Sequence, residues 1–82
     1  MWNDDGKCLK RIFMFADFSE AFSFMTRVAM EAEKLGHHPD WHNVWNRVEV
    51  KLSTHDAGNT VTEKDRELAR KIDSIYQSMR RS

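Results

Sequence analysis

The chain has 82 residues, of which 13 are basic and 13 acidic, so its formal net charge at neutral pH is zero. A chain without net charge has no overall attraction for nucleic acid or for an anionic membrane, and we expect neither as a partner. The length suits a single small domain over residues 1–82, and domains of this size often gain stability by forming oligomers.

Cysteine content and apolar runs indicate the compartment. Cys8 is the single cysteine and cannot form a disulfide within the chain, which favours a reducing, cytoplasmic setting. No apolar run approaches the roughly 20 residues that a membrane-spanning helix needs. The first eleven residues carry charges and no apolar stretch, so we expect no signal peptide.

The N-terminal segment predicts a β-hairpin. Residues 3–6 form a turn sequence that ends in Asp-Gly, and residues 8–15 are rich in strand formers. Leu9, Phe13 and Phe15 share one face of the second strand. We therefore expect two antiparallel strands, the second better defined than the first.

Residues 17–36 predict a helix. Asp17 stands at the N-cap with Glu20 three residues later, the pattern of a capping box, and Gly36 is placed to end the helix in the left-handed conformation. Apolar residues at spacings of three and four form the stripe that we expect to face the core. Its members are Phe18, Ala21, Phe22, Met25, Val28, Ala29, Ala32 and Leu35.

The second half of the chain predicts two strands and a helix. Residues 41–46 and 47–54 are extended, and the second of these runs alternates apolar and charged side chains. Residues 63–80 carry a helical apolar stripe, with Thr62 as the N-cap and Asp65 at the third helical position. The element order predicts an α+β fold of two layers, with both helices on one face of a four-stranded antiparallel sheet.

Histidines are the candidate catalytic groups. His37 and His38 follow Gly36 at the end of the first helix, and His55 follows the fourth strand. Their ordinary pKa of about 6.5 lets them give and take protons near neutral pH. If the first helix crosses the sheet, its end lies near the end of the last strand, and the three rings share one cleft.

Neighbouring residues add to this candidate site. Ser53 and Thr54 supply hydroxyl groups, and Trp41 supplies a surface on which a flat substrate can stack. Glu33 lies four residues before His37, a spacing at which a helical carboxylate can orient a ring.

Other interpretations stay open on the residues alone. The histidines also suit solvent exposure or structural hydrogen bonds. A metal site is less favoured and we expect no metal, because His37, His38, His42 and His55 match no zincin spacing and Cys8 is isolated in a strand. No nucleophile elbow is present.

Several segments resemble the pterin-4a-carbinolamine dehydratases. The most specific are residues 37–41 (HHPDW) and 52–56 (LSTHD), and the similarity extends through residues 22–29, 32–35 and 43–46. It covers most of the chain. Members of that family often carry aspartate where Gly36 stands, and they usually begin with a further N-terminal helix.

The resemblance implies a hydro-lyase that converts 4a-hydroxytetrahydrobiopterin to quinonoid dihydrobiopterin and water, recycling tetrahydrobiopterin for aromatic amino-acid hydroxylases. Such a reaction needs an acid at the departing oxygen and a base at a ring N–H. By similarity, His37 and His55 are the acid–base pair, and His38 mainly binds and orients the pterin. The pterin is the substrate, and no cofactor is expected.

The same resemblance implies which residues contact the pterin. These are Glu33, Gly36, His37, His38, Trp41, Ser53, Thr54, His55 and Asp56.

The resemblance also implies a homodimer or homotetramer, formed through sheet edges and helix packing. Phe24 and Met30 lie off the predicted stripe and are expected in the core or at an interface, and Phe24, Met30 and Trp45 are candidates for subunit contacts. The alternative function is a non-enzymatic interaction module that acts as a dimerisation cofactor of a transcription factor. That function would use the exposed part of the first helix.

Overall fold

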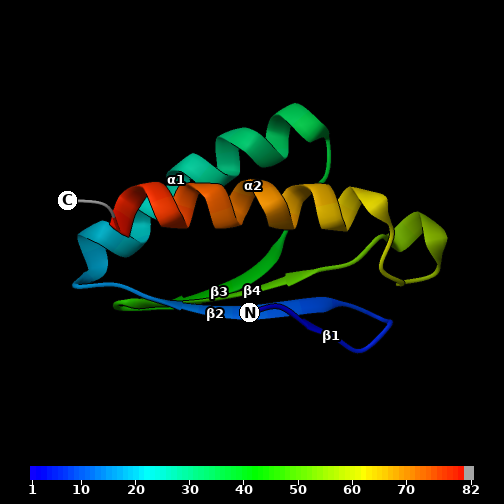
Figure 1. The fold of residues 1–82 in the computed structure, drawn as a ribbon, viewed down its shortest axis with the longest axis horizontal. Coiled ribbons are helices and arrows are strands. Elements are labelled where there is room, and N and C mark those ends of the chain that lie inside the picture. The colour runs from blue at the N-terminus through cyan, green and yellow to red at the C-terminus, as the bar shows by residue number, and fades with distance from the viewer. Residues whose placement is uncertain (81–82) are drawn as a thin grey trace.

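A computed structural model describes residues 1–80. Two long helices cover one face of a four-stranded antiparallel sheet with the strand order β1-β2-β4-β3 (Figure 1). This arrangement confirms the predicted α+β architecture. In chain order the elements are β1 (Asn3–Asp4), β2 (Leu9–Met14), α1 (Phe18–Leu35), β3 (Asp40–Val44), β4 (Arg47–Leu52), the 3₁₀ helix η1 (His55–Ala57) and α2 (Glu63–Arg80).

The N-terminal hairpin differs slightly from the prediction. Asn3 and Asp4 already pair with β2 as strand β1, and the turn lies at residues 5–8 instead of residues 3–6. Asp5 organises that turn, because its carboxylate accepts hydrogen bonds from the backbone N–H groups of Lys7 and Cys8 at 2.8 and 2.9 Å.

The predicted ends of α1 are confirmed. The Asp17 carboxylate accepts the backbone N–H of Glu20 at 2.8 Å, as an N-cap does. Gly36 has a φ of +62° at the other end, in the left-handed region that favours glycine. Its N–H donates to the carbonyls of Ala32 and Glu33, which closes the last turn. The chain therefore leaves the helix abruptly just before the histidine pair.

The buried face of α1 agrees with the predicted stripe in part, since Ala21, Val28 and Ala32 are buried as expected. Phe24, which lies off the predicted stripe, is fully buried, whereas Phe18 and Phe22 are about half exposed. The centroid of the Phe24 ring lies 4.9 Å from the ring centroids of Phe13 on β2 and of Phe15, which follows that strand. Phe18, Phe22 and Phe24 all lie at helical spacings from other apolar residues of α1, so periodicity alone does not determine which of these rings meets the sheet.

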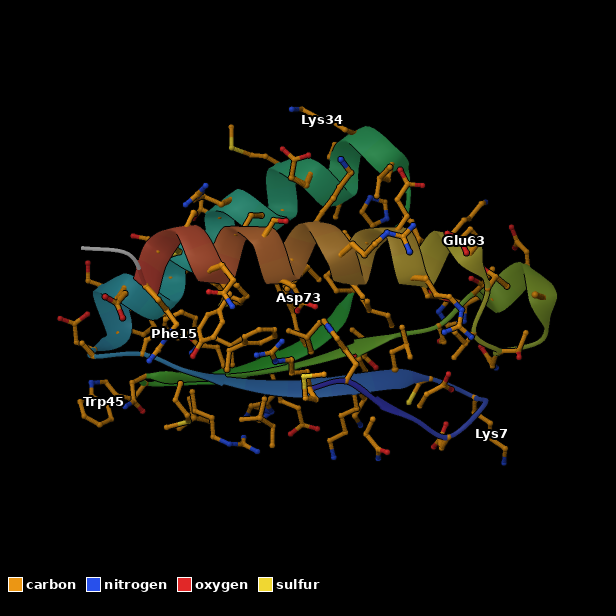
Figure 2. The ribbon with its side chains drawn as sticks, viewed as in Figure 1. Lys7, Phe15, Lys34, Trp45, Glu63 and Asp73 are labelled. Atoms are coloured by element: carbon orange, nitrogen blue, oxygen red, sulfur yellow. The ribbon has the colours of Figure 1, made fainter. Side chains whose placement is uncertain are left out.

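The core lies between the sheet and the helices. Val48, Val50 and Leu52 point inward from β4 and are fully buried, as their alternation predicts. Leu68 and Ile72 meet them from α2. Figure 2 shows Phe15 in this space, whereas the side chains on the other face of the sheet project away from the helices.

The tip of the β3–β4 hairpin exposes an aromatic ring. Trp45 has a φ of +50°, a conformation that bulky residues rarely adopt, and the residue is 63% exposed. The Asn43 amide braces the turn by donating to the carbonyls of Trp45 and Arg47 at 3.1 and 2.9 Å. The role of Trp45 in subunit contacts stays a prediction.

The burial of α1 can be tested with two matched substitutions. We expect Phe24→Ala to lower the free energy of unfolding by about 3–5 kcal/mol, because it leaves a cavity beneath the helix. Phe22→Ala removes the same atoms from an exposed position and should change stability by about 0.5 kcal/mol or less. Urea unfolding of both variants measures the difference, and equal losses would contradict the observed orientation of α1.

Candidate active site

Three segments of the chain meet around a pocket of about 350 Å³. The first follows α1, the second follows β4, and the third is the first turn of α2. The lining residues are Gly36, His37, His38, Pro39, Asp40, Ser53, Thr54, His55, Asp56 and Lys64. The expected convergence of the three histidines is therefore found in the structure.

A buried carboxylate lies beneath the pocket. Asp65 is fully buried, and its Oδ1 lies 2.5 Å from Nε2 of His37. Its Oδ2 accepts the hydroxyl of Thr54 at 2.8 Å and the backbone N–H of Thr62 at 2.9 Å. Asp65 thus joins the segment after α1, the segment after β4 and the N-terminus of α2.

These contacts determine the charge of Asp65. Burial raises the pKa of the carboxyl group, but the hydrogen bonds from His37, Thr62 and Thr54 together outweigh burial and hold the pKa below its ordinary value. The carboxylate is therefore ionised at neutral pH, and it accepts a hydrogen bond from the Nε2–H group of His37. When the imidazole is neutral, its other nitrogen, Nδ1, is then the proton acceptor.

The position of Glu33 corrects one expectation. The carboxylate lies 3.0 Å from Nε2 of His38, and His37 is held by Asp65 instead. The spacing of four residues failed because α1 ends at Leu35 and the left-handed Gly36 redirects the chain. Both partners of the Glu33–His38 pair are mostly exposed, so solvent screens the attraction between them.

Two of the expected site residues, Trp41 and Glu33, are not among the residues that line this pocket. Trp41 lies opposite Val50 on the inner face of the sheet, where it packs against the core and does not line the pocket. Glu33 is likewise absent from the lining. Thr54 does line it, and its hydroxyl donates to Asp65.

Sequence reasoning missed Asp40, Lys64 and Asp65 as site residues. Asp40 directly follows the His-His-Pro sequence, and this adjacency was the available signal. Asp65 gave a signal of another kind, because its position three residues after Thr62 predicts a helix cap. The contact with His37, across 28 positions of sequence, arises only in the folded chain.

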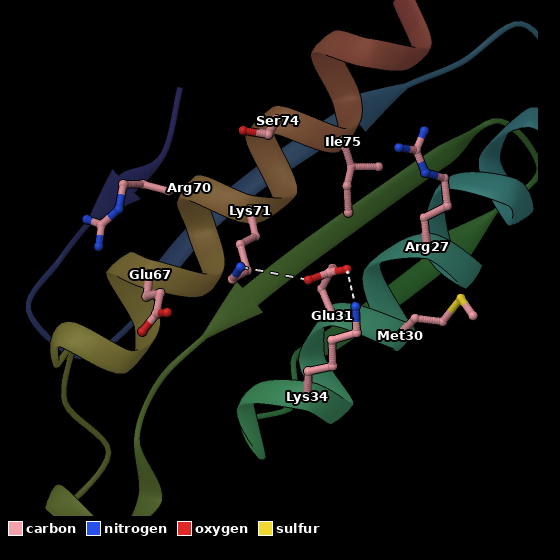
Figure 3. Close-up of a pocket in the computed structure, with 9 residues that line it drawn as sticks. All are labelled: Arg27, Met30, Glu31, Lys34, Glu67, Arg70, Lys71, Ser74 and Ile75. Atoms are coloured by element: carbon pink, nitrogen blue, oxygen red, sulfur yellow. Dashed lines mark hydrogen bonds and ion pairs between the residues drawn. The ribbon is translucent and has the colours of Figure 1, made fainter.

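A larger hollow of about 650 Å³ lies between α1 and α2, and its lining includes no histidine (Figure 3). Long charged side chains surround it, and Glu31 lies 3.3 Å from Lys34 and 3.8 Å from Lys71. Within residues 1–80, no three histidine, cysteine or acidic side chains are arranged to hold a metal ion. No helix in that range is long and apolar enough to cross a membrane.

The fold and the pocket define a small α+β protein with three histidines around one cavity. Residues 1–75 match the protein family described as pterin 4 alpha carbinolamine dehydratase. The chain therefore belongs to the pterin-4a-carbinolamine dehydratase family, a family of hydro-lyases.

Individual relatives agree with this assignment. A Mesorhizobium japonicum protein assigned by name to these dehydratases is 57% identical over 88% of this chain and 72% of its own length. A Paraburkholderia xenovorans protein with the same assignment is 60% identical over 82% of this chain and 69% of its own length.

Two solved structures share the fold. A transcriptional coactivator/pterin dehydratase from Brucella melitensis superposes with a TM-score of 0.86 at 48% identity, over 92% of this chain and 81% of that chain. A pterin dehydratase-like protein identified as a RuBisCO assembly factor in the alpha-carboxysome superposes with a TM-score of 0.76 at 24% identity. The superposition covers 92% of this chain and 88% of that chain. The second likeness shows the fold alone.

The charge of Asp65 predicts a pH dependence of stability. Because its pKa in the folded chain is depressed, its contribution is present above the ordinary value of 3.8 and is lost as the pH falls through the folded value. We expect Asp65→Asn to lower the free energy of unfolding at pH 7 by about 1–3 kcal/mol. The deficit relative to the parent protein should shrink on acidification.

Urea unfolding between pH 7 and pH 3 measures this deficit. Glu63→Gln is the matched control, because Glu63 lies in the same helical turn with its side chain 74% exposed. A deficit for Asp65→Asn that stays constant with pH would contradict the proposed ionised carboxylate.

Proposed function

We propose that this protein dehydrates 4a-hydroxytetrahydrobiopterin to quinonoid dihydrobiopterin by histidine acid–base catalysis. The observation that carries the proposal is the convergence of His37, His38 and His55 on one pocket in a chain of this family. The reaction neither oxidises nor reduces the pterin. It breaks the C4a–O bond, forms a C=N bond from the electrons of a ring N–H, and releases water.

His37 is the base in this proposal. Its Nε2 is engaged with the ionised carboxylate of Asp65, so Nδ1 of the neutral ring can take the proton from the pterin nitrogen. The imidazolium that forms is then stabilised by the buried negative charge beneath it. Asp65 positions the ring and selects its tautomer, without touching the substrate.

His55 is the acid, acting from the segment after β4. The residue begins η1 and is exposed to solvent, which can return its proton after each turnover. Protonation of the hydroxyl at C4a converts a poor leaving group into water. One proton is delivered and one is removed, so both histidines regain their starting states by exchange with solvent.

His38 and the rim of the pocket bind the pterin. The pair with Glu33 restrains the His38 ring at the mouth of the pocket, and Ser53 and Asp56 line the cavity beside His55. Asp40 and Lys64 add one charge of each sign. Recycling of tetrahydrobiopterin for aromatic amino-acid hydroxylases in the cytoplasm, by a homodimer or homotetramer, completes the proposal.

The alternative function, a non-enzymatic module for a partner helix, is favoured by a different feature. The hollow between α1 and α2 is lined by residues of these two helices alone, and no histidine is among them (Figure 3). A protein that acts only in this way would bind a helix there and leave the pterin unchanged. An assay of pterin turnover therefore separates the two functions.

Alanine substitutions test the catalytic roles. We expect His37→Ala and His55→Ala each to lower kcat by about 10²-fold or more, the usual contribution of a positioned acid or base. Stopped-flow measurement of 4a-hydroxytetrahydrobiopterin decay gives the rates. His42→Ala is the control, because His42 lies within β3, pairs with Glu49 across the sheet, and is not among the pocket residues.

Two outcomes of this assay would count against the dehydratase. Decay with the parent protein no faster than in buffer would exclude the activity. Rates for His37→Ala and His55→Ala that equal the rate for His42→Ala would exclude this pocket as its site.

A further inference from the structure

The loop that carries His55 begins after Thr54 and ends before Thr60, and these two residues are hydrogen-bonded to each other. The N–H of Thr54 donates to the carbonyl of Thr60 at 2.9 Å, which forms an isolated antiparallel bridge. The carbonyl of Thr54 accepts the N–H groups of Ala57 and Asn59 at 3.3 and 3.1 Å. Residues 55–59 therefore form a compact loop whose position is set where its two ends meet.

The end of the loop at Thr60 is hydrogen-bonded to the turn between β1 and β2. The hydroxyl of Thr60 donates to the carbonyl of Gly6 at 2.9 Å, and the N–H of Val61 donates to the same oxygen at 3.3 Å. The turn between β1 and β2 lies at the same end of the molecule as η1 (Figure 1). A contact across 54 positions of sequence thus anchors the loop that bears the proposed acid.

The turn between β1 and β2 is stabilised by its own hydrogen bonds. The N–H of Gly6 donates to the side chain of Asp4 at 2.8 Å, and Gly6 has a φ of +86°. Asp5 accepts the N–H groups of Cys8 and Lys7, and these hydrogen bonds hold its pKa below the ordinary value. The Gly6 carbonyl is therefore presented by a turn with its own hydrogen bonds.

We propose that Thr60 is a positioning residue for His55, acting through its hydroxyl on the Gly6 carbonyl. Thr60 is not among the residues that line the pocket, so its effect on a pterin runs through the loop. The proposal rests on the proposed function only where turnover is measured. The placement of the His55 ring is a separate property of the loop.

The first experiment compares Thr60→Val with Thr60→Ser in the dehydratase assay. Thr60→Val removes the hydroxyl at similar volume, and we expect kcat to fall about fivefold, the size of one lost neutral hydrogen bond, with KM nearly unchanged. Thr60→Ser keeps the hydroxyl and should restore kcat. Thr26→Val is the control, because the Thr26 hydroxyl makes a similar exposed bond, to the carbonyl of Phe22 on α1.

A double-substitution cycle separates positioning from general damage. In a His55→Ala background Thr60→Val should cause no further fall in kcat, whereas in a His38→Ala background the fall should persist. The same fall in both backgrounds would overturn the proposal. So would a Thr60→Val protein with the parent kcat.

The second experiment needs no activity. In ¹⁵N-resolved spectra of the histidine rings, Thr60→Val should shift or broaden the His55 signals and leave those of His42 unchanged. Unaltered His55 signals would overturn the proposal even in an active enzyme. If the parent protein does not turn over the pterin, the proposed function fails, and this measurement still decides the role of Thr60.

Discussion

The site depends on the burial of one ionised carboxylate. An unpaired charge in a protein interior is costly, and Asp65 is fully buried because His37, Thr54 and Thr62 each provide it with a hydrogen bond. The three donors come from three segments of the chain. Removing any one of them leaves the charge less well compensated, so the same interaction that orients the His37 ring also joins the three segments around the pocket.

Local signals predicted most of the secondary structure. The ends of α1 followed from Asp17 and Gly36, because a cap depends on a side chain and a backbone conformation within a few residues. Alternation in β4 likewise predicted which of its side chains face the core. Which aromatic ring of α1 is buried was not predictable in this way, because Phe18, Phe22 and Phe24 all suit helical periodicity and the contact with Phe13 of β2 selects Phe24.

The candidate site could be predicted only in part. The motif pointed to the histidines. Their convergence depends on the fold, which brings residues 36–40 and 53–56 to one cavity. The partners of the rings were harder to predict. Glu33 was assigned to His37 by helical spacing, but the helix ends before that spacing is completed. Asp65 was recognisable as a helix cap, and its second role depends on a tertiary contact.

The pocket is assembled from segments that are distant in the chain, so it exists only in the native state. A ligand that binds the native chain and not the unfolded chain adds RT ln(1 + [L]/Kd) to the free energy of unfolding. Any ligand held by residues 36–40 and 53–56 together would therefore tie the formation of its site to the folding of the whole chain.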